Sequence, residues 1–335
     1  MSVFVEDDVA DPGPDEHRLV VATDVADELL SPPEALGVLD RVLSRVDALG
    51  RGGVDGGTLV LVAADHPVAG VSMGAAAAAA AGLDVVVVDA GVDGEPIAGA
   101  EPLRPDGPRG ALADADALTH ADVERLVAGG RAIGVRVSRA GLVAIGEVGV
   151  GNTTVAAALA CALTGLSARD AVGLGAGADS AILARKVDVV TAALERSATA
   201  LAGASTPADH ALAMLRTVGG PEIAVLTGVV LGAVEAGSPV VLDGLAGSLP
   251  GLLATRIEPA VQAHLVAGQV SSERAHAAVL REIGLEPLLA LRLRAGEGVG
   301  ACLAASLVLQ GLRMRRTAAR TQDAGHGGAH GGDSE

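Results

Sequence analysis

Short apolar runs, rich in β-branched residues and separated by helix-like segments, constrain the fold of this 335-residue chain most strongly. Such runs are typical of buried parallel strands, because helices cover both faces of a parallel sheet. Four runs fit the pattern: TLVLVAADH (58–66), LDVVVVDAGV (83–92), LVAIGEVG (142–149) and SPVVLDG (238–244). We therefore predict an α/β fold with a Rossmann-like, doubly wound parallel sheet that binds ligands at the carboxyl ends of its strands.

The segments between these runs read mainly as helices. Helical periodicity runs through residues 32–50, and the alanine run at 74–82 leaves room only for a short helix. Thr119 is a good N-cap for a helix that continues to about residue 141. Residues 93–118, rich in Gly, Pro and Asp, are expected to form a long loop, and Ala-rich helices extend to about Arg316.

The ends of the chain differ in composition from the middle. Residues 1–30 are acidic and contain proline, so we expect a flexible arm there. Residues 31–318 are expected to form a single domain, and residues 319–335 a disordered Gly/His tail.

Charge and composition exclude several classes of protein. With 41 acidic residues against 24 Lys and Arg, the net charge of −17 argues against nucleic acids and anionic membranes as partners. We find neither a signal peptide nor a membrane span, so a cytoplasmic protein is expected. Phe4 is the only aromatic residue, so the core must be aliphatic. Cys161 and Cys302 are expected to be buried thiols.

Four polar clusters fall at expected strand ends or helix starts: ADHPVAGVS (64–72), GEVGVGNTT (146–154), GLGAGADS (173–180) and AGEGVGA (295–301). Each alone is consistent with an ordinary glycine turn. GLGAGA follows no clear strand and lacks the acidic residue that binds a dinucleotide ribose, so a dinucleotide-dependent oxidoreductase is disfavoured. No Walker A loop precedes Lys186, which is the only lysine in the chain.

Two of these clusters place a glutamate beside glycines. The turn before the helix at 152 exposes backbone N–H groups, which favour an anion such as phosphate, yet Glu147 stands within it. Glu297 has a similar setting in GEGVG. A carboxylate there is useful if the reaction involves positive charge or a proton that must be removed. Breaking an N-glycosidic bond to a pyridinium base, with an azole as acceptor, involves both.

Five stretches, taken together, resemble the nicotinate-nucleotide:dimethylbenzimidazole phosphoribosyltransferase family of the cobalamin lower-ligand pathway. They occur in family order over roughly residues 58–315: GEVGVGNTTVAAALACALTG, GLGAGADSAILARK, GGPEIAVLTGVVLGAVEAGSPVVLDG, SSERAH and GLEPLLALRLRAGEGVGACLA. The resemblance implies transfer of phosphoribose from nicotinate mononucleotide to 5,6-dimethylbenzimidazole, giving α-ribazole 5′-phosphate and nicotinate, with inversion and without a metal or other cofactor. It also implies a helical subdomain built from both chain ends, and a homodimer.

The resemblance also implies roles for particular residues. Glu297 would be the general base that takes the benzimidazole proton, and Glu147 would line the nicotinate and ribose pocket. The residues implied for binding the nucleotide are Gly149, Gly151, Asn152, Thr153, Gly175, Gly177, Lys186 and Ser271, with Asp65 and His66 at a strand end. A compact ammonium group such as that of Lys186 also suits a phosphate.

The chain departs from the family pattern at several points. The segment after Ser72 is about twenty residues shorter than the family's, and Leu174, Pro221 and Gln269-Val270 replace a family arginine, phenylalanine and His-Arg pair. Much of the wall for a bulky base is therefore missing or apolar. Two alternatives remain open: the same transfer to a different azole or purine, or a catalytically weak nucleotide-binding homologue.

Overall fold

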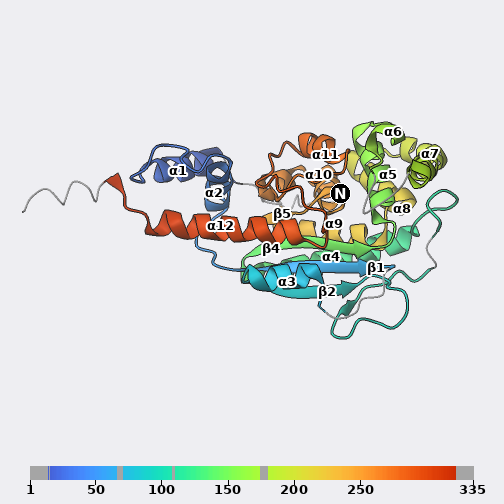
Figure 1. Cartoon of the computed structure of the whole chain (residues 1–335), viewed down its shortest axis with the longest axis horizontal. Coiled ribbons are helices and arrows are strands. Elements are labelled where there is room, and N and C mark those ends of the chain that lie inside the picture. Colours follow the sequence, from blue (N-terminus) through green and yellow to red (C-terminus); the bar gives the residue numbers. More distant parts are fainter. Residues whose placement is uncertain (1–13, 15, 66–70, 108–109, 174–179, 322–335) are drawn as a thin grey trace, which may run out of the picture.

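A single parallel sheet organises the protein (Figure 1). The structure, a computed structural model, describes residues 14, 16–65, 71–107, 110–173 and 180–321. Six strands lie in the order β3-β2-β1-β4-β5-β6, which is the strand order of a Rossmann fold. The strands are β1 (Gly57–Ala64), β2 (Asp84–Asp89), β3 (Glu101–Pro102), β4 (Leu142–Gly149), β5 (Val240–Leu242) and β6 (Leu265–Ala267). The four predicted strands are confirmed, whereas β3 and β6 were not predicted.

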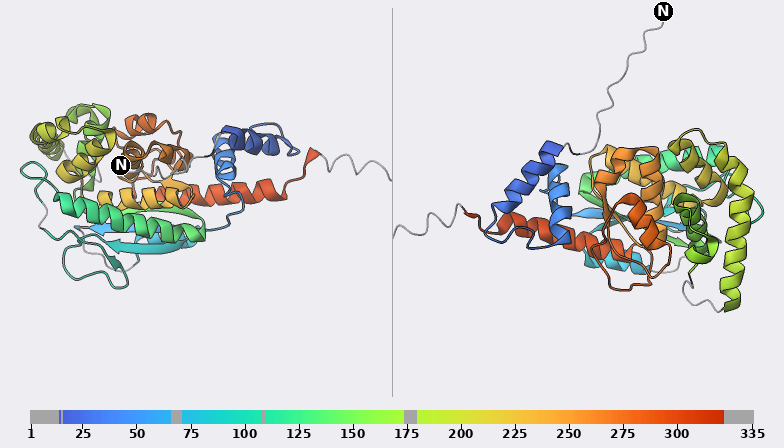
Figure 2. Two further views of the ribbon diagram at one scale, coloured as in Figure 1. Left: turned by 180° about the vertical axis from the view of Figure 1, so that it is seen from behind. Right: turned by 90° about the horizontal axis from the view of Figure 1, so that it is seen from above.

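Helices cover both faces of the sheet because alternate residues of each strand point to opposite sides. In β1, Val60 and Val62 pack in one cluster with residues of α4 (His120–Val137) and α9 (Pro221–Glu235). Leu59 and Leu61 pack in the other cluster with residues of α3 (Met73–Ala80) and α12 (Val299–Thr317). Figure 2 shows these layers from behind and from above. The predicted short helix after Ser72 and the Thr119 N-cap are both confirmed.

Glycines explain how an aliphatic core packs closely without aromatic side chains. Helices α4 and α9 approach through a seam of four glycines, two on each helix. A Cβ at Gly130 would lie 2.1 Å from the Val225 carbonyl oxygen, and one at Gly228 would lie 2.1 Å from that of Val127. The two backbones are therefore in direct contact, which replaces the volume that larger side chains would fill.

Six further helices lie in the described part of the chain: α5 (Asn152–Thr164), α6 (Ala168–Ala171), α7 (Ser180–Ala202), α8 (Pro207–Val218), α10 (Leu245–Ile257) and α11 (His276–Ile283). Figure 1 shows α5, α6, α7 and α8 gathered at one end of the sheet.

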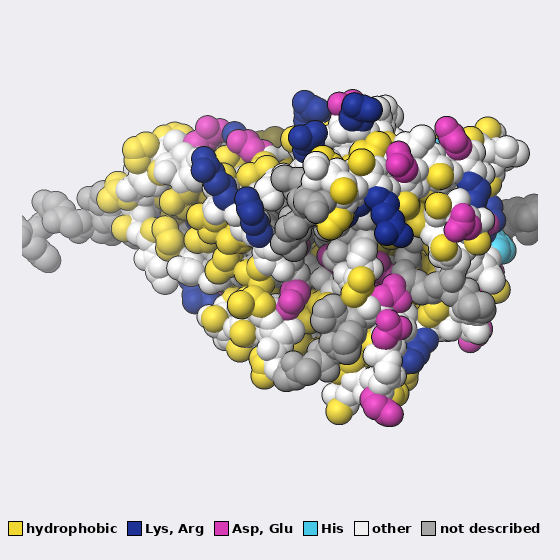
Figure 3. Space-filling model, turned by 45° about the vertical axis from the view of Figure 1, so that its right-hand side comes forward, with side chains coloured by type: hydrophobic (Ala, Val, Ile, Leu, Met, Phe, Trp, Pro, Cys, Tyr) yellow, Lys and Arg dark blue, Asp and Glu magenta, His cyan; other side chains and the backbone are white. Residues whose placement is uncertain are grey.

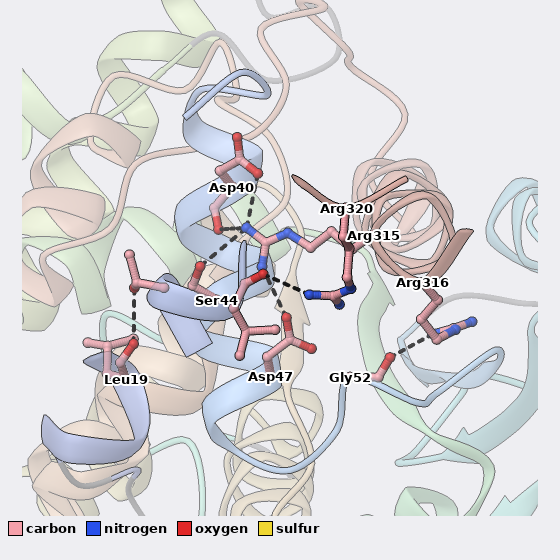
Figure 4. Close-up of polar contacts among 10 residues, drawn as sticks. Leu19, Asp40, Ser44, Asp47, Gly52, Arg315, Arg316 and Arg320 are labelled. Carbon is pink, nitrogen blue, oxygen red and sulfur yellow. Dashed lines mark hydrogen bonds and ion pairs between the residues drawn. The ribbon is translucent and has the colours of Figure 1, made fainter. Parts of the chain in front are cut away.

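The two chain ends build a helical subdomain, as the resemblance implied. Helices α1 (Glu16–Asp27) and α2 (Val38–Ala48) pack with α12, which projects past the sheet. Arg315 of α12 is 8% exposed and binds α2 by contacts to Asp40, Ser44 and Asp47 at 3.0–3.2 Å (Figure 4). One cation thus connects two segments that are far apart in sequence.

The expected boundaries at the chain ends need correction. The flexible arm is wrong for residues 16–27, which form α1 and pack on α2, where Ala22 is buried. The disordered tail is wrong for residues 319–321, since the Leu30 N–H donates to the Ala319 carbonyl (2.8 Å) and the Thr321 N–H to the Glu28 carbonyl (2.9 Å). Residues 1–13, 15 and 322–335 lie outside the described residues.

Cys161 and Cys302 are free and buried, as predicted. Within the described ranges, no helix is both long and apolar enough to cross a membrane.

Candidate active site

The site begins where β4 ends and α5 starts. Gly151 adopts a left-handed conformation (φ 79°) that turns the chain into α5, whose first N–H groups point out of the helix start. Asn152, the first residue of α5, donates a hydrogen bond from Nδ2 to Glu147 Oε2 at 2.6 Å. Glu147 is therefore fixed beneath the turn rather than extended into solvent.

Glu147 lies in an environment that disfavours its charge. Its side chain is 6% exposed, and the carboxyl groups of Glu222, Asp243 and Glu297 lie near enough to act on it. Burial raises the pKa of Glu147 to about 8; the hydrogen bond from Asn152 opposes the shift, and the three neighbouring carboxyl groups add to it. Glu147 is consequently protonated at neutral pH.

Asp243 connects the end of β5 with the start of α12. It accepts hydrogen bonds from Gln269 Nε2 (2.9 Å) and from the Gly298 N–H (3.0 Å). Burial raises the pKa of Asp243, whereas these bonds and those from the N–H groups of Gly300 and Ala301 oppose the rise. Asp243 thus holds the GEGVG segment against the sheet.

Glu297 reaches the site through this GEGVG segment. Its backbone has φ 56°, and it lies between Gly296 and Gly298, which also have positive φ values. A Cβ at Gly146 of β4 would lie 2.6 Å from the Glu297 carbonyl carbon, so the segment contacts β4 directly. The backbone of Glu297 therefore lies against β4 one residue before Glu147, and the Glu297 carboxyl group is near enough to act on that of Glu147.

A cavity of about 210 Å³ is lined by Glu147 and Asp243 and by Gly296, the residue before Glu297. Asn152, Thr153 and Ser271 also line it. Arg294 is the basic residue among its described lining residues. The Ser271 Oγ accepts a hydrogen bond from the Glu273 N–H at 3.0 Å, which fixes the loop after β6.

The other predicted binding residues fall into three groups. Lys186 of α7 donates to Thr153 Oγ1 at 3.2 Å, so the single lysine does reach the helix start. Asp65 and Gly151 line a neighbouring cavity of about 310 Å³, and Gly149 lies at the turn beside Ala64 and Asn152. His66, Gly175 and Gly177 lie outside the described residues.

Sequence reasoning missed several residues of the site. Asp243 directly follows a correctly predicted strand, so its position at the carboxyl end of that strand was a usable signal. Glu222, which is 2% exposed at the start of α9, and Arg294 carried no comparable signal. Gln269 is buried, and its Oε1 has no hydrogen-bond partner among the described residues.

The arrangement suits a ligand that carries both a phosphate and a positive charge. In the described part of the chain, no group of three or more His, Cys, Asp and Glu side chains is arranged to hold a metal ion. Carboxyl groups and an anion-binding helix start face the same region, so a ligand with a phosphate at one end and positive charge at the other would be complementary.

Comparison with known proteins gives a consistent result. A phosphoribosyltransferase family model matches residues 68–325. The nicotinate-nucleotide–dimethylbenzimidazole phosphoribosyltransferase of Thermus thermophilus is 38% identical over 323 residues, which cover 86% of this chain and 92% of that protein. The enzyme of that name from Desulforudis audaxviator is 34% identical, covering 93% and 94%.

Solved structures agree with these relatives. The crystal structure of CobT from Thermus thermophilus superposes with a TM-score of 0.81 at 36% identity and covers 92% of this chain and 98% of that one. Family match, identity and fold coincide over nearly the whole chain. The chain therefore belongs to the family of nicotinate-nucleotide–dimethylbenzimidazole phosphoribosyltransferases.

Proposed function

We propose that this protein transfers the phosphoribosyl group of nicotinate mononucleotide to 5,6-dimethylbenzimidazole, releasing nicotinate and α-ribazole 5′-phosphate. One observation supports the proposal: Glu147 lies beside the start of α5, and the carboxyl groups of Glu222, Asp243 and Glu297 are near enough to act on it. Negative charge in such a group of acids favours a pyridinium ring and the oxocarbenium-like transition state that forms when the ring leaves. The α5 start favours the phosphate at the other end of the nucleotide.

The bond changes balance without any further reagent. An acceptor nitrogen attacks C1′ of the ribose, and the C1′–N bond of nicotinate mononucleotide breaks, with its electron pair passing to the pyridine nitrogen. The acceptor then carries a positive charge until its remaining N–H proton passes to the Glu297 carboxylate. Neutral azole and free nicotinate are the resulting states of the two rings.

Glu147 has a different role from Glu297 in this proposal. Because its pKa is raised to about 8, it is neutral at pH 7 and donates a hydrogen bond. Asn152 orients it through the contact to Oε2, so the acidic proton is directed to the ribose and nicotinate side. One carboxyl group then serves as a donor and the other as a base.

The phosphate is assigned to the start of α5. Lys186 beside Thr153 supplies positive charge, and the turn at Gly149 and Gly151 exposes backbone N–H groups. We assign Gly175 and Gly177 to the same phosphate. Ser271 is assigned to the ribose side of the cavity, and Asp65 and His66 to the neighbouring strand end.

A panel of bases tests the proposal. Purified protein is incubated with nicotinate mononucleotide and with 5,6-dimethylbenzimidazole, benzimidazole, imidazole or adenine, and both products are quantified. Release of nicotinate in equal amount to α-ribazole phosphate is expected with 5,6-dimethylbenzimidazole. Absence of both products for every base, with nucleotide binding retained, would contradict transfer and support a nucleotide-binding homologue.

A second acceptor class is favoured by one observation. Helix α3 starts directly after Ser72, and Val71 and Met73 beside it are 81% and 61% exposed. After Gly74 the side chains of α3 are alanine, and such small aliphatic groups suit a smaller or differently shaped azole or a purine. A reaction with adenine or imidazole and none with 5,6-dimethylbenzimidazole would establish this alternative.

We also infer a homodimer and a cytoplasmic location. Exposed apolar side chains project from α12 (Leu303, Leu307 and Met314), and Figure 3 shows apolar side chains spread over one half of the face drawn. Light scattering coupled to gel filtration should give twice the 32.8 kDa chain mass, and a single-chain mass would contradict the dimer. Fractionation of cells that express a tagged chain tests the location. A chain of charge −17 should not be retained on a DNA column.

A further inference from the structure

The short helix α3 begins at the side chain of Glu297. Ser72 caps the helix by accepting a hydrogen bond from the Ala75 N–H at 3.1 Å. A second donor of the first turn, the Gly74 N–H, donates to Glu297 Oε2 at 3.1 Å. Glu297 and Ser72 thus share the task of satisfying the helix start.

Glu297 needs support because of its own backbone. It is one of the few residues other than glycine with a positive φ, a conformation that is strained for an L-amino acid. Asp243 fixes the residue after it through the Gly298 N–H, as described above. These contacts hold the main chain but leave the direction of the side chain undetermined.

Gly74 permits a contact that any other residue would block. A Cβ on Gly74 would lie 2.0 Å from the Glu297 carbonyl oxygen and 3.1 Å from its Cβ. The obstructing atom belongs to the backbone and cannot rotate away, so a side chain at position 74 would push α3 away from Glu297. The 3.1 Å hydrogen bond depends on the same close approach.

The polarity of the helix start gives this contact a chemical consequence. Helix α3 contains no charged residue, so its first turn presents a backbone N–H group to the Glu297 carboxyl group. The N-terminal end of a helix carries a partial positive charge, which attracts a carboxylate. The start of α3 therefore attracts and orients the Glu297 side chain through the Gly74 N–H.

We propose that Gly74 is a positioning residue that holds the Glu297 carboxylate directed at the acceptor base. The proposal rests on the function proposed above, in which Glu297 is the base. Gly74 acts through Glu297 and does not contact substrate. The alanine run therefore does more than pack against the sheet, because it forms the helix whose first turn contacts Glu297.

Substitution of Gly74 by alanine tests the proposal kinetically. In Gly74→Ala, loss of a hydrogen bond to a charged group should lower kcat by about 10- to 100-fold, with the KM for nicotinate mononucleotide unchanged. Ala79→Gly weakens the same helix at an exposed position away from Glu297 and should keep wild-type kcat. A Gly74→Ala protein with wild-type kcat, or an equal loss in Ala79→Gly, would overturn the proposal.

A double variant separates positioning from general damage. If Gly74 acts through Glu297, then Gly74→Ala should cause no further loss in a Glu297→Gln background, so the two effects should not add. Fully additive losses would show that Gly74 acts by another route. If Glu297→Gln itself leaves turnover unchanged, the assignment of the base fails, and with it the proposed mechanism.

A spectroscopic measurement covers the case in which Gly74→Ala fails to fold. The amide resonance of Gly74 in ¹⁵N-labelled protein should move as Glu297 ionises, and it should stay fixed in folded Glu297→Gln. This readout reports the contact whether or not the transfer reaction occurs, so it separates the two proposals. The same titration of the Gly74 resonance in both proteins would overturn the positioning role.

Discussion

Replacement of Glu147 by glutamine should make the protein more stable at alkaline pH. Glu147 is 6% exposed and has a pKa of about 8, against 4.5 for an unperturbed glutamate. Because the folded pKa lies above the unfolded one, the wild-type protein loses stability as pH rises from about 4.5 to about 8. Glutamine resembles the protonated acid in shape and can still accept the hydrogen bond from Asn152.

The size of the effect follows from the shift in pKa. The raised pKa of Glu147 lowers the free energy of unfolding by up to about 5 kcal/mol above pH 8, and about 3 kcal/mol of this is already lost at pH 7. Glu147→Gln has no group that ionises at this position and avoids this loss. The free energy of unfolding of the variant should therefore gain ~4 kcal/mol on that of the wild type between pH 5 and pH 9.

Urea unfolding at a series of pH values measures the difference. The two stability curves should lie close together at pH 5 and separate steadily towards pH 9. Glu195→Gln, an exposed control on α7, should follow the wild type throughout. Parallel curves for Glu147→Gln and the wild type would show that the pKa of Glu147 is not raised. The different roles proposed for Glu147 and Glu297 depend on that raised pKa.

Two further substitutions test the phosphate site and the core. Lys186→Ala should raise the KM for nicotinate mononucleotide about 10- to 100-fold, with kcat little changed, because it removes the cation beside Thr153. Steady-state kinetics measure both constants, and an unaffected KM would count against the phosphate contact. Gly228→Ala should lower the free energy of unfolding by about 1–3 kcal/mol, because the new Cβ would meet the Val127 carbonyl oxygen. An unchanged midpoint of urea unfolding would show that α4 and α9 can move apart without loss of stability.

The central strands were predictable because burial on both faces demands long β-branched runs. TLVLVAADH and LVAIGEVG contain β1 and β4 almost without error. Strand β3 is only two residues long, and the three residues of β6 directly follow a 3-10 helix (Pro259–His264), so neither stands out as a separate apolar run. Helix α1 was missed because local acidity suggested an arm, whereas contacts with α2 stabilise it.

The candidate site, like the fold, has parts that the sequence predicts and parts that it does not. The turn after β4 and the two glutamates flanked by glycine have a local signature, and the resemblance gave their roles. The hydrogen bonds from Gln269 to Asp243 and from Gly74 to Glu297 join residues that are far apart in the chain. No local pattern records which distant backbone atom approaches a glycine, so these contacts required the structure.

Turnover of Glu297→Gln with nicotinate mononucleotide and 5,6-dimethylbenzimidazole tests the central claim most directly, with nucleotide affinity measured in parallel by calorimetry. Loss of the base should reduce turnover by about 10²–10⁴-fold while the affinity stays close to that of the wild type. Wild-type turnover in this variant would contradict the account, because no carboxylate at position 297 would then be needed to take the acceptor proton.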